Sequence, residues 1–253
     1  MFDVIRIPAF KDNYIWLLRK GASAAVVDPG DARPVLEVLE REGLSLRTIF
    51  VTHHHADHQG GVMSLLAHHP AEVFAPAAES IAGVTRPLHG GERIRAAFCD
   101  VEFQVLAVPG HTLGHIAYYG AGCLFCGDTL FAGGCGRLFE GSAAQLFDSL
   151  SRLASLPDQT EVYCAHEYTE ANLRFALAVE PANHCLQSRV NEVAVARAKG
   201  WSTVPSTIAI EKASNPFLRC AEPEVVASAR RRAPRAADEV AVFAALREWK
   251  NSF

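Results

Sequence analysis

Four histidines and one aspartate occur within six residues of this chain, in the segment Thr52-His53-His54-His55-Ala56-Asp57-His58. The apolar run 48–51 predicts a buried strand before the segment, and the run 62–66 predicts the start of a helix after it. In an extended backbone His53 and His55 point to the same side, whereas Asp57 and His58 follow the bend and can reach a second point. Imidazole nitrogens and carboxylates suit zinc, iron or manganese. The alternative is a histidine-rich polar loop, but a chance H-x-H-x-D-H arises in only about one such chain in a thousand. We therefore predict a metal site.

Three further polar residues follow other expected strands. His111 comes after the predicted hairpin 94–108, Asp128 after the strand 123–126, and His166 after the strand 161–164. With the first cluster this makes seven ligands, which is too many for one tetrahedral site and suits two adjacent metals that share a carboxylate. Asp128 is the natural bridge. The seven predicted metal ligands are His53, His55, Asp57, His58, His111, Asp128 and His166.

The bulk properties indicate an ordinary globular protein. The chain has 253 residues, 49% hydrophobic residues and a formal charge of −4, which gives no general attraction to nucleic acid or to an anionic membrane. No apolar run reaches the roughly 20 residues that a membrane helix needs, and the first residues alternate like a strand rather than a signal peptide. Seven scattered cysteines, an odd number, argue against a disulfide framework and for the cytoplasm. We expect a monomer.

The pattern of elements changes near residue 170. Before it, short strands alternate with helices, which predicts an α/β catalytic domain over residues 1–170. Beyond it, apolar residues recur at helical spacing, which predicts a helical domain over 171–253. The helices expected there cover residues 173–179, 186–198, 223–232 and 236–250.

These residues resemble the metallo-β-lactamase fold superfamily, whose signature H-x-H-x-D-H is matched by residues 53–58, and most closely its glyoxalase II branch, the hydroxyacylglutathione hydrolases. Further matches are the P-G-H-T-x-G-H segment at His111, G-D-T-L-F at Asp128, Gly134-Cys135-Gly136-Arg137, His166-Glu167-Tyr168-Thr169 and Asn215-Pro216-Phe217-Leu218-Arg219. The resemblance implies a four-layer αβ/βα sandwich for residues 1–170 and a helical, glutathione-binding domain for 171–253.

The resemblance also implies an activity. This is the hydrolysis of S-D-lactoylglutathione to glutathione and D-lactate, the second step of methylglyoxal detoxification, with two divalent ions, expected to be Zn²⁺ with iron or manganese as alternatives. It assigns His53, His55 and His111 to one ion, and Asp57, His58 and His166 to the other, with Asp128 shared. Asp57 and Asp128 are the expected catalytic residues, and Arg137, His166, Tyr168 and Arg219 the expected substrate-binding residues.

Two departures affect the expected glutathione site. Phe139 stands where some members have tyrosine, and no second basic residue follows Arg219.

The chemistry requires no protein nucleophile, because a metal-bridged hydroxide attacks the thioester and the leaving thiol, with a pKa of about 8.5, departs readily. Cys164 is therefore expected in the core.

Three other functions remain as alternatives. A sulfur dioxygenase of the same superfamily acts on glutathione persulfide with one iron. Another hydrolase of this fold, such as a β-lactamase or an RNA-processing nuclease, would be exported or carry a basic surface. A scaffold that binds metal only for stability is the alternative outside enzymology.

Overall fold

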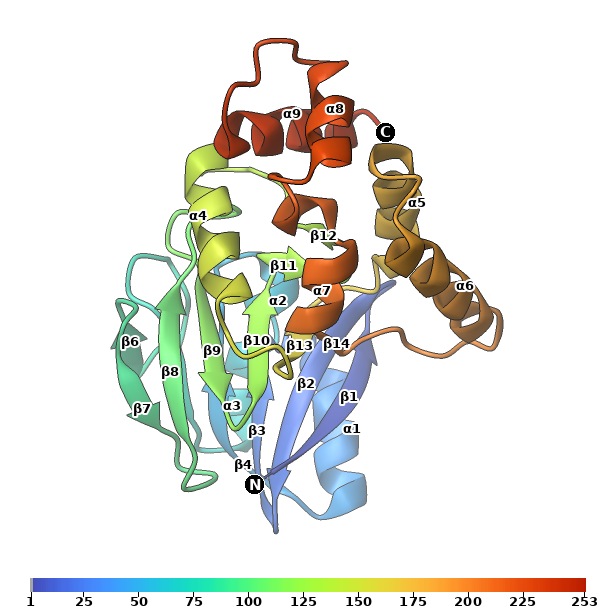
Figure 1. Ribbon diagram of the computed structural model, residues 1–253. Helices are drawn as coiled ribbons and strands as arrows, with labels where there is room; N and C mark the ends of the chain where they lie inside the picture. Colours follow the sequence, from blue (N-terminus) through green and yellow to red (C-terminus); the bar gives the residue numbers. More distant parts are fainter. Residues whose placement is uncertain (1) are drawn as a thin grey trace. The chain divides into compact units, whose positions relative to one another are not determined.

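The protein is described here over residues 2–253 of a computed structural model (Figure 1). The contacts between residues divide the chain into two compact units. Unit 1 comprises residues 2–107 and 114–127, and unit 2 comprises residues 108–113 and 128–253. The expected domain boundary near residue 170 stays a prediction. Within residues 2–253 no helix combines the length and the apolarity needed to cross a bilayer.

Unit 1 contains a six-stranded sheet in the order β1 to β6. Strands β1, β2 and β3 pair antiparallel, and β3 to β6 pair parallel. Most residues of β3, β4 and β5 are buried, as is typical of parallel strands whose sheet is covered on both faces. The bounds are β1 (Asp3–Ala9), β2 (Asn13–Lys20), β3 (Ser23–Val27), β4 (Ser45–Phe50), β5 (Glu72–Pro76) and β6 (Arg86–Leu88). The histidine segment follows β4 directly, as predicted.

A second set of strands in unit 1 pairs antiparallel in the order β7-β8-β9-β10. Their bounds are β7 (Arg93–Arg95), β8 (Glu102–Ala107), β9 (Ile116–Gly120) and β10 (Cys123–Gly127). Tyr118 of β9 joins the two sheets, because its hydroxyl donates to Val51 O at 2.9 Å and to Phe74 O at 3.0 Å. Burial raises the pKa of Tyr118 well above its ordinary value, so this hydroxyl keeps its proton.

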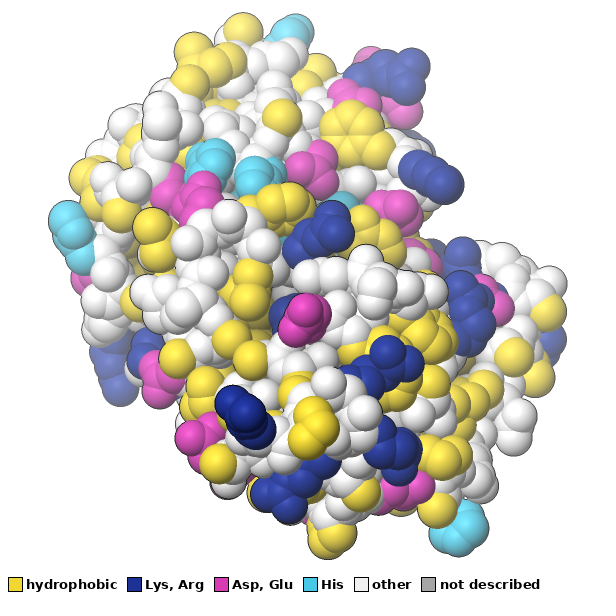
Figure 2. Space-filling model, turned by 90° about the horizontal axis from the view of Figure 1, so that it is seen from above, with side chains coloured by type: hydrophobic (Ala, Val, Ile, Leu, Met, Phe, Trp, Pro, Cys, Tyr) yellow, Lys and Arg dark blue, Asp and Glu magenta, His cyan; other side chains and the backbone are white. Residues whose placement is uncertain are grey.

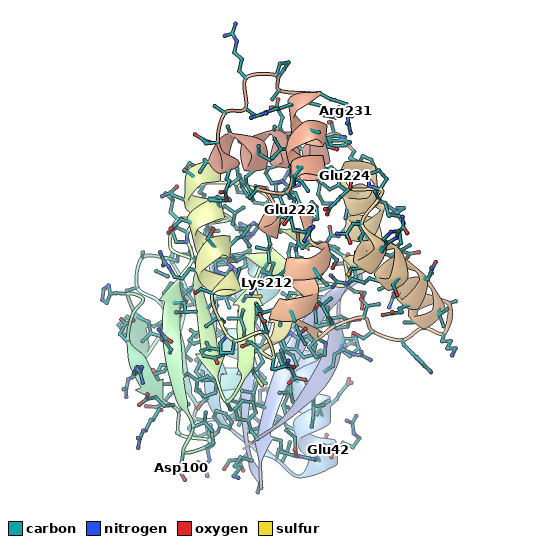
Figure 3. All side chains as sticks on the ribbon, viewed as in Figure 1. Glu42, Asp100, Lys212, Glu222, Glu224 and Arg231 are labelled. Carbon is teal, nitrogen blue, oxygen red and sulfur yellow. The ribbon has the colours of Figure 1, made fainter. Side chains whose placement is uncertain are left out.

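Three helices accompany the first sheet: α1 (Ala32–Glu42), α2 (Ala56–Gln59) and α3 (Val62–His68). Helix α1 has a recognisable cap at each end. Asp31 caps it by accepting a hydrogen bond from Arg33 N, and Gly43 ends it with φ +64°. Its apolar residues Val35 and Leu39 pack into the core of unit 1. Glu42, at the end of α1, is labelled in Figure 3.

In unit 2, the small hairpin β11 (Leu130–Phe131) and β12 (Gly134–Cys135) follows Asp128. The other elements are α4 (Ala143–Ala154), β13 (Glu161–Cys164), α5 (Thr169–Val179), α6 (His184–Ala198), β14 (Ser206–Thr207), α7 (Ile208–Ser214), the 3-10 turn η1 (Pro216–Leu218), α8 (Pro223–Arg230) and α9 (Glu239–Asn251). The four helices expected after residue 170 correspond to α5, α6, α8 and α9. Helix α7 was not expected, because it has only seven residues and two of its first three are β-branched isoleucines, which favour strands.

Charged side chains lie at the helix ends of unit 2. Arg230, Arg231 and Arg232 stand at the C-terminal end of α8, where cations complement the helix dipole. Figure 2 looks onto the side of α8 and α9 and shows several Lys and Arg side chains there. Lys212 of α7, labelled in Figure 3, pairs with Asp158 at 2.9 Å.

One glycine brings the turn after β3 against the histidine segment. A Cβ at Gly30 would lie 1.9 Å from the backbone oxygen of Asp57. We expect Gly30→Ala to lower the free energy of unfolding by about 3 kcal/mol, because backbone must move. Gly21→Ala is the control: its φ is +58° but its Cβ meets nothing within 4 Å, so the cost is about 1 kcal/mol. Equal losses in urea unfolding would contradict this close approach.

Candidate metal centre

Residues 52–58, here called the ligand loop, carry four of the expected ligands in unit 1. His53 and His58 have no exposed surface. The ligand atoms of His53 and His55 lie within 4.8 Å of each other, as do those of His53 and His58 and those of Asp57 and His58. His53 Nε2 is 3.0 Å from His55 Nδ1. Two imidazoles on one tetrahedral zinc place their nitrogens about 3.3 Å apart, so this pair has the spacing of shared ligands.

Asp28, which the sequence reasoning missed, orients the ligand loop from the end of β3. Its carboxylate accepts from Thr52 N and Thr52 Oγ1, both at 2.8 Å, and lies 3.0 Å from His58 Nδ1. A carboxylate at Nδ1 keeps the proton there and leaves Nε2 as the electron-pair donor, which is the arrangement typical of metal-binding histidines. Asp28 has φ +52°, a conformation that aspartate tolerates better than most residues.

Two further polar side chains fix the ligand loop. Asn13 donates to Asp57 Oδ2 at 2.9 Å, which restricts the orientation of that carboxylate. Glu79 accepts from His54 N at 2.5 Å and from Gly114 N at 3.1 Å, and lies 3.0 Å from His54 Nδ1. The imidazole of His54 is thus directed at Glu79. His115 stacks on His53 with ring centres 4.6 Å apart.

The other three expected ligands, His111, Asp128 and His166, lie together in unit 2. One oxygen of Asp128 is 3.4 Å from His111 Nε2, and the other is 3.3 Å from His166 Nε2. These separations exceed the usual length of a charge-assisted hydrogen bond and match the roughly 3.3 Å between two ligands of one tetrahedral ion. All three side chains are at least nine-tenths buried. The carboxylate of Asp128 thus lies between the two imidazoles.

The remaining nitrogen of His111 is held by the backbone. His111 Nδ1 lies 2.8 Å from Arg137 O. A carbonyl oxygen only accepts, so this contact places the proton on Nδ1 and directs the lone pair of Nε2 toward Asp128. In unit 1, His53 Nδ1 is similarly 3.1 Å from Thr52 Oγ1. The donor types and their orientation in both units therefore fit a divalent metal.

Two of the expected substrate-binding residues, Tyr168 and Arg137, lie beside the ligands of unit 2, together with Phe139. Tyr168 stacks on His166 with ring centres 4.7 Å apart and planes 4° apart, and 37% of its surface is exposed. Phe139 is exposed and meets the His111 ring edge-on at 5.2 Å. The guanidinium of Arg137 lies 5.9 Å from the centre of the Phe139 ring.

Arg219 differs from the expectation of a cation open to substrate. Its Nε and one terminal nitrogen both donate to Glu180 at 2.8 Å, and the other terminal nitrogen donates to Lys212 O at 3.0 Å. Burial alone would raise the pKa of Glu180, but the hydrogen bonds from Arg219 and Asn183 lower it. Arg219 therefore has a structural partner, and its contact with glutathione stays a prediction.

Cys164 has no reactive character, although it is close to His166 in the chain. It is wholly buried, and burial raises its pKa to about 12. Its thiol is therefore protonated at neutral pH and is a poor nucleophile. The prediction that it is a core residue is confirmed.

Comparisons with known proteins identify the family. Residues 10–166 match the family model of the metallo-beta-lactamase superfamily, and residues 167–253 match that of the hydroxyacylglutathione hydrolase C-terminus. The hydroxyacylglutathione hydrolase of Dechloromonas aromatica is 57% identical over 267 residues, covering 100% of both chains. The chain belongs to the hydroxyacylglutathione hydrolase family. The expected membership of the glyoxalase II branch and the expected class of thiolester hydrolase are confirmed.

Solved structures support the same fold. The structure of ETHE1 from Myxococcus xanthus aligns with a TM-score of 0.66 at 26% identity, over 100% of this chain and 99% of that one. The protein TTHA1623, solved in a di-iron-bound form, aligns with a TM-score of 0.54 at 31% identity, over 65% of this chain and 91% of that one. The expected fold class, a metallo-β-lactamase-type α/β sandwich followed by a helical region, is confirmed.

Asp28→Asn tests whether Asp28 orients His58. The amide keeps the size of the carboxylate, but its NH₂ group would face either Thr52 N or His58 Nδ1, so one partner is lost. We expect metal affinity to fall about 10- to 100-fold, measured by titration of metal-free protein. Asp31→Asn is the matched control on the same turn, because Asp31 only caps α1 and asparagine caps equally well. An unchanged affinity in Asp28→Asn would contradict the orienting role.

Proposed function

We propose that this hydrolase cleaves S-2-hydroxyacylglutathione thioesters, S-D-lactoylglutathione foremost, to glutathione and a 2-hydroxy acid. Seven side chains, in two groups, would hold a pair of divalent ions: His53, His55, Asp57 and His58 from unit 1, and His111, Asp128 and His166 from unit 2. The observation that carries the proposal is the Asp128 carboxylate, each of whose oxygens lies 3.3–3.4 Å from a different imidazole. This is the arrangement that a carboxylate needs to give one oxygen to each ion.

The residues divide the remaining work. When bound, the ions supply a water of lowered pKa and stabilise the negative charge that develops on the thioester oxygen. Asp57, restrained by Asn13, and Asp128 set the charge of the site. Tyr168, stacked on His166, and Arg137 stand beside the ligands of unit 2, where they would contact the glutathione part of the substrate. His166 would contribute both to the metal and to the wall of this substrate site.

Zinc is the ion that we propose, because neutral imidazoles and carboxylates suit it. The di-iron form of TTHA1623 keeps iron as the first alternative. A sulfur dioxygenase with one iron is less well supported, since seven donors exceed the needs of one ion and the C-terminal match is to the hydrolase family.

We further propose a cytoplasmic monomer whose partner is the glutathione thioester alone, with no nucleic acid and no membrane. The odd, scattered set of seven cysteines favours a reducing compartment.

The direct test is the loss of thioester absorbance with S-D-lactoylglutathione on metal-analysed protein. We expect about two metal ions per chain and turnover on the order of 1–1,000 per second. Asp128→Ala should retain its fold while losing at least one ion and about a thousandfold or more of kcat, since one carboxylate serves both ions. His184→Ala, at an exposed histidine on α6, is the control. A single iron with oxygen consumption on glutathione persulfide would establish the dioxygenase instead, and wild-type turnover without metal would refute the proposed site.

A pair of variants separates the two roles of Arg219. If it binds a substrate carboxylate, Arg219→Met should raise KM about tenfold or more, while Glu180→Gln, which leaves the guanidinium in place, should not raise KM. A purely structural role predicts lower thermal stability in both variants with KM unchanged.

The structural contribution of Glu180 depends on pH. Its pKa is lowered in the folded protein, so the stability it provides is present above its unfolded pKa and is lost as the pH falls through the folded one. The stability difference between wild type and Glu180→Gln should therefore shrink on acidification.

A further inference from the structure

Residues 130–137, here called the hairpin loop, hold two of the expected ligands through backbone contacts. A Cβ at Gly136 would lie 1.9 Å from Asp128 O, so the two backbones touch. Gly136 N donates to Thr129 O at 3.1 Å, and Arg137 O lies 2.8 Å from His111 Nδ1. The position of the hairpin loop therefore sets the position of Asp128 and the orientation of His111.

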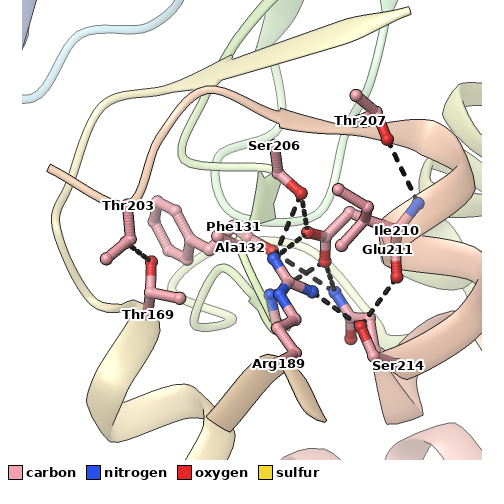
Figure 4. Close-up of polar contacts among 12 residues, drawn as sticks. Phe131, Ala132, Thr169, Arg189, Thr203, Ser206, Thr207, Ile210, Glu211 and Ser214 are labelled. Atoms are coloured by element: carbon pink, nitrogen blue, oxygen red, sulfur yellow. Dashed lines mark hydrogen bonds and ion pairs between the residues drawn. The ribbon is translucent and has the colours of Figure 1, made fainter. Parts of the chain in front are cut away.

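A buried carboxylate of α7 holds the turn of the hairpin loop. Glu211 accepts from Gly133 N at 2.8 Å and from Asn215 Nδ2 at 3.0 Å. The same amide of Asn215 lies 2.9 Å from Gly134 O and 3.3 Å from Phe131 O. Arg189 of α6 donates to the other oxygen of Glu211 and balances its charge, and Ser206 donates to that oxygen as well (Figure 4). Glu211 and Asn215 are wholly buried, so these bonds are made without competing water.

A buried arginine of α9 holds the other end of the hairpin loop. Arg247 donates from one terminal nitrogen to Cys135 O at 3.0 Å and to Gly136 O at 3.4 Å. Only 5% of the residue is exposed, and its guanidinium lies 5.1 Å from the centre of the Phe217 ring. Within residues 2–253 no carboxylate pairs with it. A buried cation without a carboxylate carries a desolvation cost, and its shortest polar contact is with the hairpin loop.

We propose that Arg247, together with Glu211 and Asn215, is a positioning residue for the metal ligands Asp128 and His111. The C-terminal helices would then help to build the metal site as well as contribute to substrate binding. This inference rests on the proposed metal roles of Asp128 and His111. Groups that orient metal ligands in this way typically change metal affinity 10- to 100-fold when they are removed.

The test compares Arg247→Met with Arg230→Met. Arg230 also donates to a backbone carbonyl of the helical region, Ala236 O at 3.0 Å, but it does not contact the hairpin loop. In metal-free protein we expect amide hydrogen exchange of residues 130–137 to accelerate in Arg247→Met and not in Arg230→Met. In Co²⁺-loaded protein we expect a changed visible absorption spectrum and about tenfold weaker Co²⁺ binding in Arg247→Met only. Arg247→Lys keeps one donor that methionine lacks, so its amide exchange and its Co²⁺ binding should lie between those of wild type and Arg247→Met.

Each result bears on the proposal. Exchange, Co²⁺ spectrum and affinity that match wild type in a folded Arg247→Met protein would overturn it, as would equal effects in Arg230→Met. If Arg247→Met does not fold, Arg247→Lys carries the same comparison, and a wild-type spectrum with wild-type exchange there would also overturn it. Failure of the wild type to bind Co²⁺ would instead refute the proposed metal function, and the exchange measurement on metal-free protein would still decide whether Arg247 holds the hairpin loop.

Discussion

The candidate site depends on hydrogen bonds to the histidine nitrogens that do not face the ligand cluster. A neutral imidazole has one N–H and one lone pair, and the partner of the N–H decides which nitrogen can bind a metal. Asp28 lies at Nδ1 of His58, and the backbone oxygen of Arg137 lies at Nδ1 of His111. These partners come from the end of β3 and from the loop after β12. The surrounding fold therefore determines which nitrogen of each expected ligand is free to bind a metal.

Two buried carboxylates show how the fold supplies hydrogen-bond donors where water is excluded. Asp28 has three donors within 3.0 Å, and Glu211 has donors from Gly133, Asn215, Ser206 and the guanidinium of Arg189. A carboxylate buried without donors carries a large desolvation cost, which several hydrogen bonds offset. Each such carboxylate also joins segments distant in the sequence. Asp28 contacts the ligand loop itself, and Glu211 contacts the hairpin loop that follows Asp128.

The expected metal ligands are easier to recognise in the sequence than the residues that hold them. His53 to His58, Asp128 and His166 could be found because they follow apolar strands directly, and strand ends are recognisable from local pattern. The helix caps Asp31 and Ser142 likewise bond to backbone groups two and three residues away. Asp28, Asn13 and Glu79 could not be found in this way, since their partners lie 24–44 residues away. Helix α7, which provides Glu211, was missed because its isoleucines and its shortness resemble a strand. Tertiary packing overrides such weak local preferences.

The glycines of the hairpin loop explain why the helices must hold it. Gly134 and Gly136 have no room for a Cβ, because Asn172 and the backbone of Asp128 lie at 2.6 Å and 1.9 Å from where that atom would be. Close approach therefore demands glycine, and these two positions contribute no side chain of their own to the packing of the loop. Donors on other elements reach the backbone there, from Asn215 to Gly134 O and from Arg247 to Cys135 O. The sequence Gly-Gly-Cys-Gly indicates that something comes close, but only the fold identifies which side chains hold the loop in place.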